Sequence, residues 1–479
     1  MNVPPGPLLP AQRKRDLLRS FLLSTIDGIF AIPIGLISLP GNVLLVVLVT
    51  EAFRFSDSAF GIFMALPFIA NFLQIFAMPL LAQWRPAKFV TAFSAALHLL
   101  SWIALGCALP WLRHLGPVPA AHWLMGWFLV SSLFAAVNGV AWNAWTQQWV
   151  PARLRGKFFG ERNRWVQVAA LVFLAAAGWV LGRWHSAIPV FQGLIAVVSV
   201  MRVVSLRCLW RTPALPLKKE EEVSLPLREK IRILGGSTSF LLFSAFGCAW
   251  SFAANCLGPF YPVFMFGPMR MSAFEVGMTA TLAQLGGALS LPVWGGLLDR
   301  YGNKPVMIVS LVFWQLSNFF WCFAIPANHW MLYLLWLWAG ATGAGFALGL
   351  FTLLLRVLPV EAKNLAIGFN LAVTSLFAAA APIAGGYALQ WALGRNSDPL
   401  EVYHLFFALP PVLALAGAAL LWRVREPAAS SLAVVVGAMR NIRTLGGVLG
   451  LGFLTNYLFL KPGARPPKAD RAKIQHEGG

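Results

Sequence analysis

Residues 295–304 read GGLLDRYGNK, a charged, glycine-bearing turn between two long apolar segments. About twenty apolar residues precede this turn and about twenty follow it, which is the length that one helix needs to cross a bilayer. A cluster of Asp, Arg and Lys is too costly to bury in hydrocarbon. The stretch therefore predicts two membrane helices that are joined by a very short loop.

A degraded copy of this stretch lies 216 residues upstream. The segment Arg54–Gly61 matches Arg270–Gly277 at that offset. The same offset places three further residues on the charged turn, namely Gln83 on Asp299, Pro86 on Gly302 and Lys88 on Lys304. A second offset of 208 residues aligns the loop residues Pro151, Arg155 and Gly160 with Pro359, Lys363 and Gly368. Two related halves are therefore predicted, and chance similarity between apolar segments is the alternative.

The composition places the chain in a membrane. Of its 479 residues, 58% are hydrophobic and 11% are charged, against about 25% charged residues in soluble proteins. Because a backbone in lipid must satisfy its own hydrogen bonds, long apolar runs predict an all-α membrane protein. The five cysteines lack C-x-x-C spacing, so no metal, disulfide framework or cofactor is expected: Cys107, Cys208, Cys248, Cys256 and Cys322.

The net charge of +20 is distributed unevenly between the predicted loops. With the loops assigned from the apolar segments, 32 of the 37 Lys and Arg residues fall on one side. The other five are Arg54, Arg113, Arg183, Arg270 and Arg395. This asymmetry follows the positive-inside rule and predicts that both termini are cytoplasmic. It explains the basic charge without a nucleic-acid partner and indicates contact with membrane lipids.

Twelve apolar segments are expected to span the membrane, near residues 21–50, 58–82, 88–110, 121–149, 163–183, 187–207, 237–262, 272–298, 305–325, 329–356, 364–392 and 400–422. The expected organisation is a cytoplasmic N-terminal tail (1–20), a six-helix bundle (21–207), a cytoplasmic linker (208–236), a second six-helix bundle (237–422) and a cytoplasmic tail (423–479). Residues 432–460 form a further apolar stretch that contains Arg440 and Arg443. We interpret it as an interfacial amphipathic helix, and a thirteenth span is the alternative.

Residues 15–425 resemble the major facilitator superfamily. Its loop motif is matched by Gly295, Asp299, Arg300, Gly302 and Lys304, with Asn303 in place of a basic residue. The segment Arg155–Asn163 also resembles the loop between the fourth and fifth helices of bacterial members. The resemblance implies two pseudo-symmetric six-helix bundles, and a monomeric secondary transporter in the bacterial inner membrane that moves a small-molecule solute by alternating access.

The resemblance also implies a conformational gate. In the family, the loop aspartate approaches the start of a helix from the other half, where a helix N-terminus favours negative charge. Carried over, Asp299 is expected near residues 157–164 and the basic side chain of Arg155. The equivalent position in the first half, Gln83, lacks that charge, although Lys88 is retained. A local ion pair of Asp299 with Arg300 or Lys304 is the alternative.

Polar side chains in the middle of the predicted helices are candidate ligands for the solute. The implied cavity helices carry eight of them: Asn42, Asn71, Gln74, Asn138, Trp142, Trp145, Asn255 and Gln284. Asn138, Trp142 and Trp145 are spaced i, i+4, i+7 and share one helical face. Amide and indole groups suit a neutral polar solute. The alternative is that the amides join helices and the tryptophans mark the membrane interface.

Asp27 is the one acidic residue that this assignment leaves inside a span and away from its first few residues. A buried carboxyl group can bind a proton, so Asp27 is the candidate for proton coupling, and an interfacial carboxylate paired with the basic tail is the alternative. No Lys or Arg is expected at mid-span, which argues against an anionic solute. No H-E-x-x-H or paired-acid motif predicts an enzyme. The remaining alternative to a transporter is a non-transporting receptor or scaffold on the same fold.

Overall fold

The computed structural model describes residues 10–84, 86–184, 188–213, 225–395, 398–426 and 430–439. Within these ranges it describes only the backbone of residues 10–14, 78–84, 147, 152–157, 160, 364, 438 and 439. The described part of the chain is helical and contains no strand.

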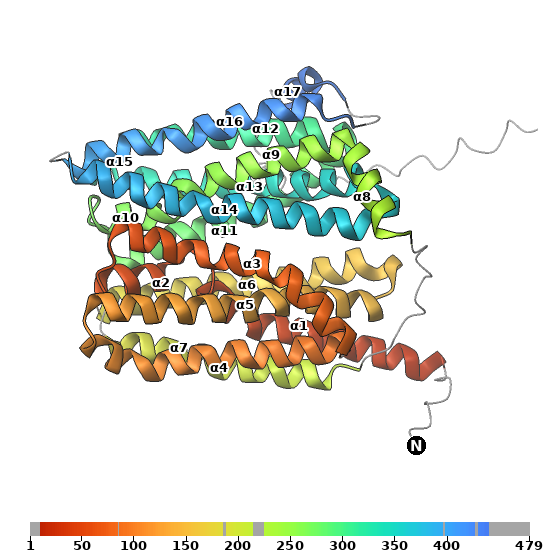
Figure 1. The fold of residues 1–479 in the computed structure, drawn as a ribbon, viewed down its shortest axis with the longest axis horizontal. Helices are drawn as coiled ribbons and strands as arrows, with labels where there is room; N and C mark the ends of the chain where they lie inside the picture. Colours follow the sequence, from red (N-terminus) through yellow and green to blue (C-terminus); the bar gives the residue numbers. More distant parts are fainter. Residues whose placement is uncertain are drawn as a thin grey trace, which may run out of the picture.

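Two sets of helices, one from each half of the chain, lie one above the other (Figure 1). The first set, the N-half, comprises α1 Pro10–Ile37, α2 Val43–Val47, α3 Asp57–Trp84, α4 Ala87–His114, α5 Pro117–Trp149, α6 Ala152–Trp184 and α7 Ile188–Arg211. The second set, the C-half, comprises α8 Leu227–Gly236, α9 Thr238–Leu257, α10 Tyr261–Phe266, α11 Ala273–Tyr301, α12 Asn303–Asn318, α13 Trp330–Val357, α14 Lys363–Leu393, α15 Pro399–Phe407, α16 Leu409–Arg423 and α17 Leu432–Met439.

Twelve helical segments in the described ranges are long and apolar enough to cross a membrane. Short irregular turns interrupt or flank several of them: a π-helical turn at Leu48–Ala52, and 3₁₀ turns at Gly258–Phe260, Phe319–Phe323, Pro326–Asn328 and Val360–Ala362. The twelve segments confirm the predicted fold class, an all-α, multi-pass membrane protein with six spans in each half.

Each half packs mainly within itself. In the N-half, α1 packs on α6 and α7, α4 on α5 and α7, and α3 on α5. In the C-half, α9 packs on α14 and α16, α11 on α13, and α12 on α13 and α16. The two halves meet along two helix pairs, α3 with α14 and α6 with α11.

The internal repeat is visible in the backbone at Arg54 and Arg270. Both residues have a left-handed conformation, with φ values of 52° and 53°, which is uncommon outside glycine. The next residue closes the same turn in each half, since Phe55 N donates to Val49 O at 2.9 Å and Met271 N donates to Met265 O at 2.8 Å. Arg54 and Arg270 differ by the 216-residue offset seen in the sequence, so the two halves are structurally related.

The first predicted span, 21–50, is too long. Helix α1 ends at Ile37, and the chain then turns at Gly41, whose φ is +76°. Asn42 starts α2, because its side chain accepts from the backbone of Leu44 and Leu45 at 2.9 and 3.2 Å. The apolar composition alone suggested one continuous helix, but the Pro40-Gly41 pair interrupts it.

Two short helices lie outside the twelve segments. Helix α8 falls in the predicted linker and packs against α9 and α14, with Leu234 buried. Helix α17 begins the predicted tail and packs on α12, with Val435 buried. Arg440, Arg443 and the rest of the proposed interfacial helix lie outside the described residues, so the domain boundaries and that helix stay predictions.

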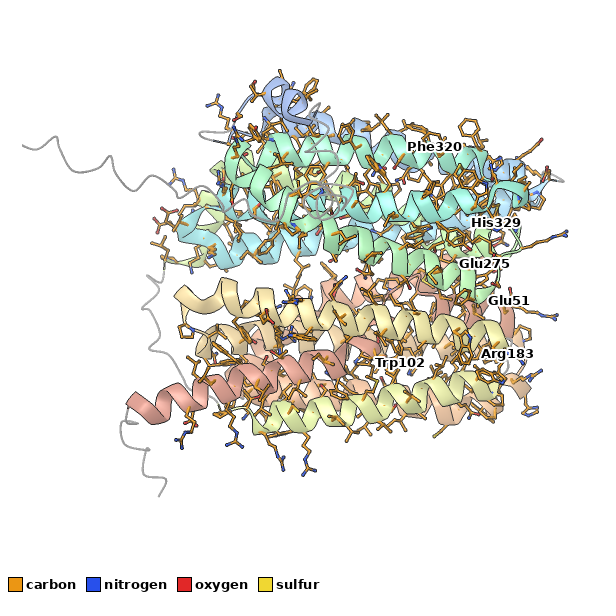
Figure 2. All side chains as sticks on the ribbon, turned by 180° about the vertical axis from the view of Figure 1, so that it is seen from behind. Glu51, Trp102, Arg183, Glu275, Phe320 and His329 are labelled. Atoms are coloured by element: carbon orange, nitrogen blue, oxygen red, sulfur yellow. The ribbon has the colours of Figure 1, made fainter. Side chains whose placement is uncertain are left out.

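The two ends of the molecule differ in charge. The end that we call the opposite end carries Arg54, Arg113, Arg183, Arg270 and Arg395, and Figure 2 shows Arg183 there with Glu51, Glu275 and His329. The other end, which we call the basic end, carries Lys88, Lys304, Arg356 and Arg423.

Candidate functional site

A cavity of about 590 Å³ lies against the N-half. Helices α1, α3, α4, α5 and α7 contribute to it, and Leu371 of α14 closes it from the C-half. We call it the N-half cavity. Its polar lining consists of Ser38, Asn71, Gln74, His98, Ser132, Asn138, Asn143 and Arg202. The cavity has the size of a small-molecule site, about 300–1,000 Å³.

Three of the eight candidate ligands predicted from the sequence line this cavity together. Asn71 and Gln74 come from α3 and Asn138 comes from α5. Gln74 is 4% exposed, and its Oε1 has no hydrogen-bond partner among the described residues. The hydroxyl of Ser132 on α5 is likewise buried and unpartnered within the described chain. Such groups each destabilise a protein by about 1–3 kcal/mol, and a bound solute that completes their hydrogen bonds would recover this energy.

The other five candidates lie elsewhere. Asn42 is a helix cap, and its Nδ2 donates to Ile37 O and Leu39 O at 2.6 and 2.9 Å. The Asn255 side chain donates to Ser251 O on its own helix at 2.8 Å. Gln284 on α11 accepts from Gln167 on α6 at 2.8 Å, so this amide joins the two halves.

The two tryptophans Trp142 and Trp145 share a helix with Asn138 but pack away from the cavity. Trp142 lies under the guanidinium of Arg162, 4.5 Å from its ring centre. Trp145 is 3% exposed and packs against Trp149, with ring centres 6.0 Å apart. The helical spacing of α5 alone could not separate the two tryptophans from Asn138. Side chains of α4 and α6 cover the part of the helical face that carries the tryptophans.

Arg202 on α7 corrects the expectation that no Lys or Arg lies at mid-span. Its side chain is 5% exposed and lines the N-half cavity. Nη1 donates to Ser205 Oγ at 2.9 Å, and Nη2 makes a long contact of 3.4 Å with Asn138 Oδ1. Asn138 is itself held by a 2.8 Å bond from its Nδ2 to Thr91 O. The signal was present in the sequence, since residue 202 falls within the predicted sixth span.

Asp27 is buried beside this arginine. Ser205 Oγ donates to Asp27 Oδ1 at 2.6 Å, so one hydroxyl joins the carboxylate to the guanidinium of Arg202. Asp27 also interacts electrostatically with Arg162 on α6. The carboxylate is 4% exposed, which places it inside the N-half rather than at the interface with the basic tail.

Arg162 reaches Asp27 because Gly28 leaves space on α1. A Cβ atom at Gly28 would lie 2.7 Å from Arg162 Nη2. The Arg162 Nε donates to Ser24 O at 3.2 Å, and the guanidinium stacks over Trp142. Sequence reasoning placed Arg162 in a loop as a possible partner of Asp299. The structure instead places it between α1 and α5.

His98 on α4 is a further buried group that sequence reasoning missed. Trp102, which Figure 2 shows inside the N-half, donates its Nε1–H to His98 Nε2 at 3.1 Å. The same nitrogen lies 3.1 Å from Ser38 Oγ. His98 Nε2 therefore accepts from Trp102, and the ring stands at the cavity wall.

The two halves touch closely at the opposite end. Gly61 on α3 meets Pro382 and Gly386 on α14, and a Cβ atom at Gly61 would lie 3.2 Å from Gly386 Cα. Gly277 on α11 meets Gly178 on α6, where the same distance would be 3.1 Å. The 216-residue offset relates Gly61 to Gly277, and the 208-residue offset relates Gly178 to Gly386. The two contacts are therefore pseudo-symmetric copies that seal this end.

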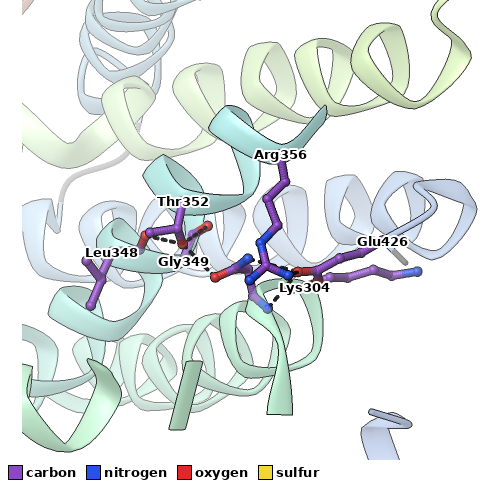
Figure 3. Close-up of polar contacts among 7 residues, drawn as sticks. Lys304, Leu348, Gly349, Thr352, Arg356 and Glu426 are labelled. Carbon is purple, nitrogen blue, oxygen red and sulfur yellow. Dashed lines mark hydrogen bonds and ion pairs between the residues drawn. The ribbon is translucent and has the colours of Figure 1, made fainter. Parts of the chain in front are cut away.

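At the basic end, the predicted gate loop is tied to its own half. Gly302, with φ of +95°, ends α11 and starts α12. Glu426, beyond α16, accepts from the backbone N of Asn303 and Lys304 at 3.0 and 2.7 Å. Arg356 of α13 completes the group with a 3.0 Å ion pair to Glu426, as Figure 3 shows. Glu426 was not predicted, because it lies far from the loop in the sequence.

The replaced motif residue Asn303 has a structural role there. Its side chain is 3% exposed, donates to Glu426 at 2.8 Å and accepts from Thr352 Oγ1 at 2.8 Å. A basic side chain would supply no acceptor for Thr352.

The proposed latch is not formed among the described residues. Asp299 is exposed, and it has no hydrogen bond or ion pair within the described chain. Arg300 is exposed and lies over Tyr301, 5.3 Å from the ring centre. An added Cβ at Gly295 would meet nothing within 4 Å, so no close approach requires that glycine here. The side chains of Gln83 and Arg155 lie outside the described atoms.

Comparisons with known proteins agree with this architecture. The model of the Major Facilitator Superfamily matches residues 242–460. The multi-drug resistance efflux pump PmrA of Streptococcus pneumoniae is 30% identical over 114 residues, which cover 23% of this chain and 28% of that pump. The match thus spans little more than a quarter of the relative's length.

Solved structures share the fold over most of the chain. The D-xylose-proton symporter superposes with a TM-score of 0.66 at 14% identity, covering 85% of this chain and 98% of the symporter. A mutant of the nucleoside transporter NupG gives 0.64 at 15% identity, covering 86% and 100%. A bacterial homologue of the lysosomal transporter Spinster, in an inward-facing conformation, gives 0.59 at 15% identity, covering 88% and 100%.

The two pseudo-symmetric six-helix halves form a multi-pass membrane protein whose fold is similar to that of these solved transporters. The chain is thus similar to the major facilitator superfamily in fold and, over residues 242–460, in sequence.

Proposed function

We propose that the protein is a secondary active transporter that moves a small polar solute by alternating access, with the N-half cavity as its binding site. The observation that carries this proposal is the group of buried, unpartnered polar atoms at the cavity, which includes Gln74 Oε1 and Ser132 Oγ. The similarity to the major facilitator superfamily supports it, and so does the position of the cavity beside the C-half residue Leu371. The preference for a neutral solute rested on amide and indole groups and on the absence of a mid-span Lys or Arg, and Arg202 removes the second of these grounds.

We further propose that the basic end faces the cytoplasm of a bacterial cell, with both termini on that side of the inner membrane. The glycine contacts at the opposite end would then close the outer side. In this assignment the structure is inward-open, and the exposed, unpartnered Asp299 represents a released latch.

Asp27 is the proposed site of proton coupling. Asp27 is buried, and the Ser205 hydroxyl joins its carboxylate to Arg202, which lines the cavity. Asp27→Asn is expected to abolish the response of transport to a pH gradient, while exchange of solute across the membrane continues. Unchanged pH dependence would leave Asp27 a structural residue.

Alternating access can be tested before the solute is known. In a variant without the five native cysteines, Asn143→Cys, at an exposed position of the cavity wall, is labelled with a membrane-impermeant maleimide in right-side-out and in inside-out vesicles. A transporter should show labelling from both sides, whereas a receptor or scaffold fixed in one state should show it from one side only. Ser290→Cys is the matched control, because Ser290 is fully buried on α11 and should stay unlabelled.

A further inference from the structure

The buried charges beside the N-half cavity do not cancel. Asp27 on α1 interacts electrostatically with Arg202 and Cys208 on α7 and with Arg162 on α6, so the charges of two guanidinium groups act on one carboxylate. His98 on α4 faces Arg202 from the other side of the cavity. An uncompensated charge in a low-dielectric site is costly, and an anion that enters the cavity would offset it.

The geometry of Arg202 shows where an anion would bind. Its Nη1 is used by Ser205, but its Nε is buried and has no acceptor among the described residues. Its Nη2 has only the 3.4 Å contact with Asn138. Nε and Nη2 lie on the same edge of the planar guanidinium, and this edge matches the two oxygens of a carboxylate.

The rest of the cavity suits the body of a hydroxylated molecule. Gln74 Oε1 is a free acceptor and Ser132 Oγ can donate or accept, within the described residues. Asn71 and Asn143 add amide groups to the wall. Hydroxyl groups on a solute could both donate to and accept from these side chains. An alkyl or aromatic carboxylate has no hydroxyl groups and would leave the side chains without hydrogen-bond partners.

We propose that the N-half cavity binds a small hydroxylated monocarboxylate, such as a sugar acid, with its carboxylate on the Nε–Nη2 edge of Arg202. The inference rests on the proposed function, since it names the solute class of that same site. When the anion neutralises Arg202, Asp27 loses most of its favourable interaction with that guanidinium through Ser205. Asp27 then takes one proton from solution, and one proton moves with each anion.

The first test is a binding measurement on the purified protein by titration calorimetry. D-glucuronate is compared with D-glucuronamide, which has the same ring and hydroxyl groups but no charge. Glucuronate is expected to bind at least tenfold more tightly. Arg202→Lys keeps the charge but loses the fork, and should weaken glucuronate binding tenfold or more. Arg207→Lys on the exposed face of the same helix is the control and should leave binding unchanged.

The second test measures the proton. In weakly buffered solution with a pH-sensitive dye, glucuronate should cause uptake of about one proton per protein molecule. Asp27→Asn should abolish this uptake while glucuronate still binds, and Asp16→Asn near the start of α1 should not alter it. If Arg202→Lys is unstable, the double variant Asp27→Asn/Arg202→Gln removes both charges together, and it should fold but fail to discriminate glucuronate from glucuronamide.

Three results would overturn the inference: equal affinity for glucuronate and glucuronamide, no glucuronate binding at millimolar concentration, or full binding by Arg202→Lys. Proton uptake that persists in Asp27→Asn would overturn the coupling step. These failures are separable from failure of the transporter proposal. Labelling of Asn143→Cys from both sides would keep alternating access even if glucuronate does not bind, and one-sided labelling would reject it whatever binds.

Discussion

Lys88 and Lys304 make the same contact in the two halves of the molecule. Lys88 Nζ donates to Trp210 O and Thr212 O at 3.0 and 2.7 Å, at the end of α7. Lys304 Nζ donates to Trp422 O and Val424 O at 3.0 and 2.9 Å, at the end of α16. Each lysine thus caps the last spanning helix of its own half, where a cation is favoured by the helix dipole and by carbonyls that lack intrahelical partners.

Loss of either lysine should destabilise its own half. Lys88→Met and Lys304→Met each remove two charge-assisted hydrogen bonds, and we expect a loss of about 1–3 kcal/mol in the free energy of unfolding. Thermal unfolding of the purified protein checks this. Because the two sites are far apart and share no partner, the double variant should show the sum of the single effects. The exposed Lys363→Met serves as control. No change in either single variant would mean that water replaces the lysine at no cost.

Glu426 should matter more for stability than other acids at the basic end. Its carboxylate is fully buried and holds the start of α12 and Arg356. Glu426→Gln removes the charge that pairs with Arg356 and with the start of α12. We therefore expect the free energy of unfolding to fall by about 3 kcal/mol or more. The matched control is Glu361→Gln, which is exposed and should have little effect. Equal melting temperatures for the two variants would show that the cluster contributes little to stability.

The glycine contact between α3 and α14 should set the conformational equilibrium. Gly61→Ala places a methyl group against Pro382 and should separate the halves at the opposite end. Overpacking of about 1–3 kcal/mol corresponds to a population shift of roughly fivefold or more. Spin labels at the exposed residues Val118 and Leu405 can measure this distance. Gly126→Ala, where a Cβ meets nothing within 4 Å, should leave the distances unchanged. A variant with wild-type distances would show that this contact does not limit opening.

The prediction that Asp299 is a latch concerns the state in which the basic end is closed. Because Asp299 has no partner among the described residues here, Asp299→Asn should leave this state unaffected and destabilise the state in which the basic end is closed. A carboxylate near a helix N-terminus contributes about 0.3–2 kcal/mol, and a loss of about 1.4 kcal/mol would raise the population of the open state by roughly tenfold. Gln83→Asp should act in the opposite direction. Spin labels at Leu18 and Val360, both exposed at the basic end, measure the effect. Identical distance distributions in wild type and Asp299→Asn would remove the latch.

The sequence by itself determined the fold class, the twelve spans and the internal repeat. These features depend on hydropathy and on the spacing of Arg, Gly, Pro and Lys, which a single chain displays directly. The alignment of Lys88 with Lys304 and of Arg54 with Arg270 even predicted which residues have equivalent positions. Asn71, Gln74 and Asn138 were found because a polar group inside a span needs a partner or a water-filled space.

Only the tertiary structure decided which polar residues act together. Helical spacing placed Asn138, Trp142 and Trp145 on one face, but the packing of α4 and α6 left only Asn138 at the cavity. The group of Asp27, Ser205 and Arg202 joins residues about 175 positions apart, and the approach of Arg162 depends on a missing side chain at Gly28. The free energy of a buried charge depends on what lies across from it, and no local pattern in the sequence contains that information.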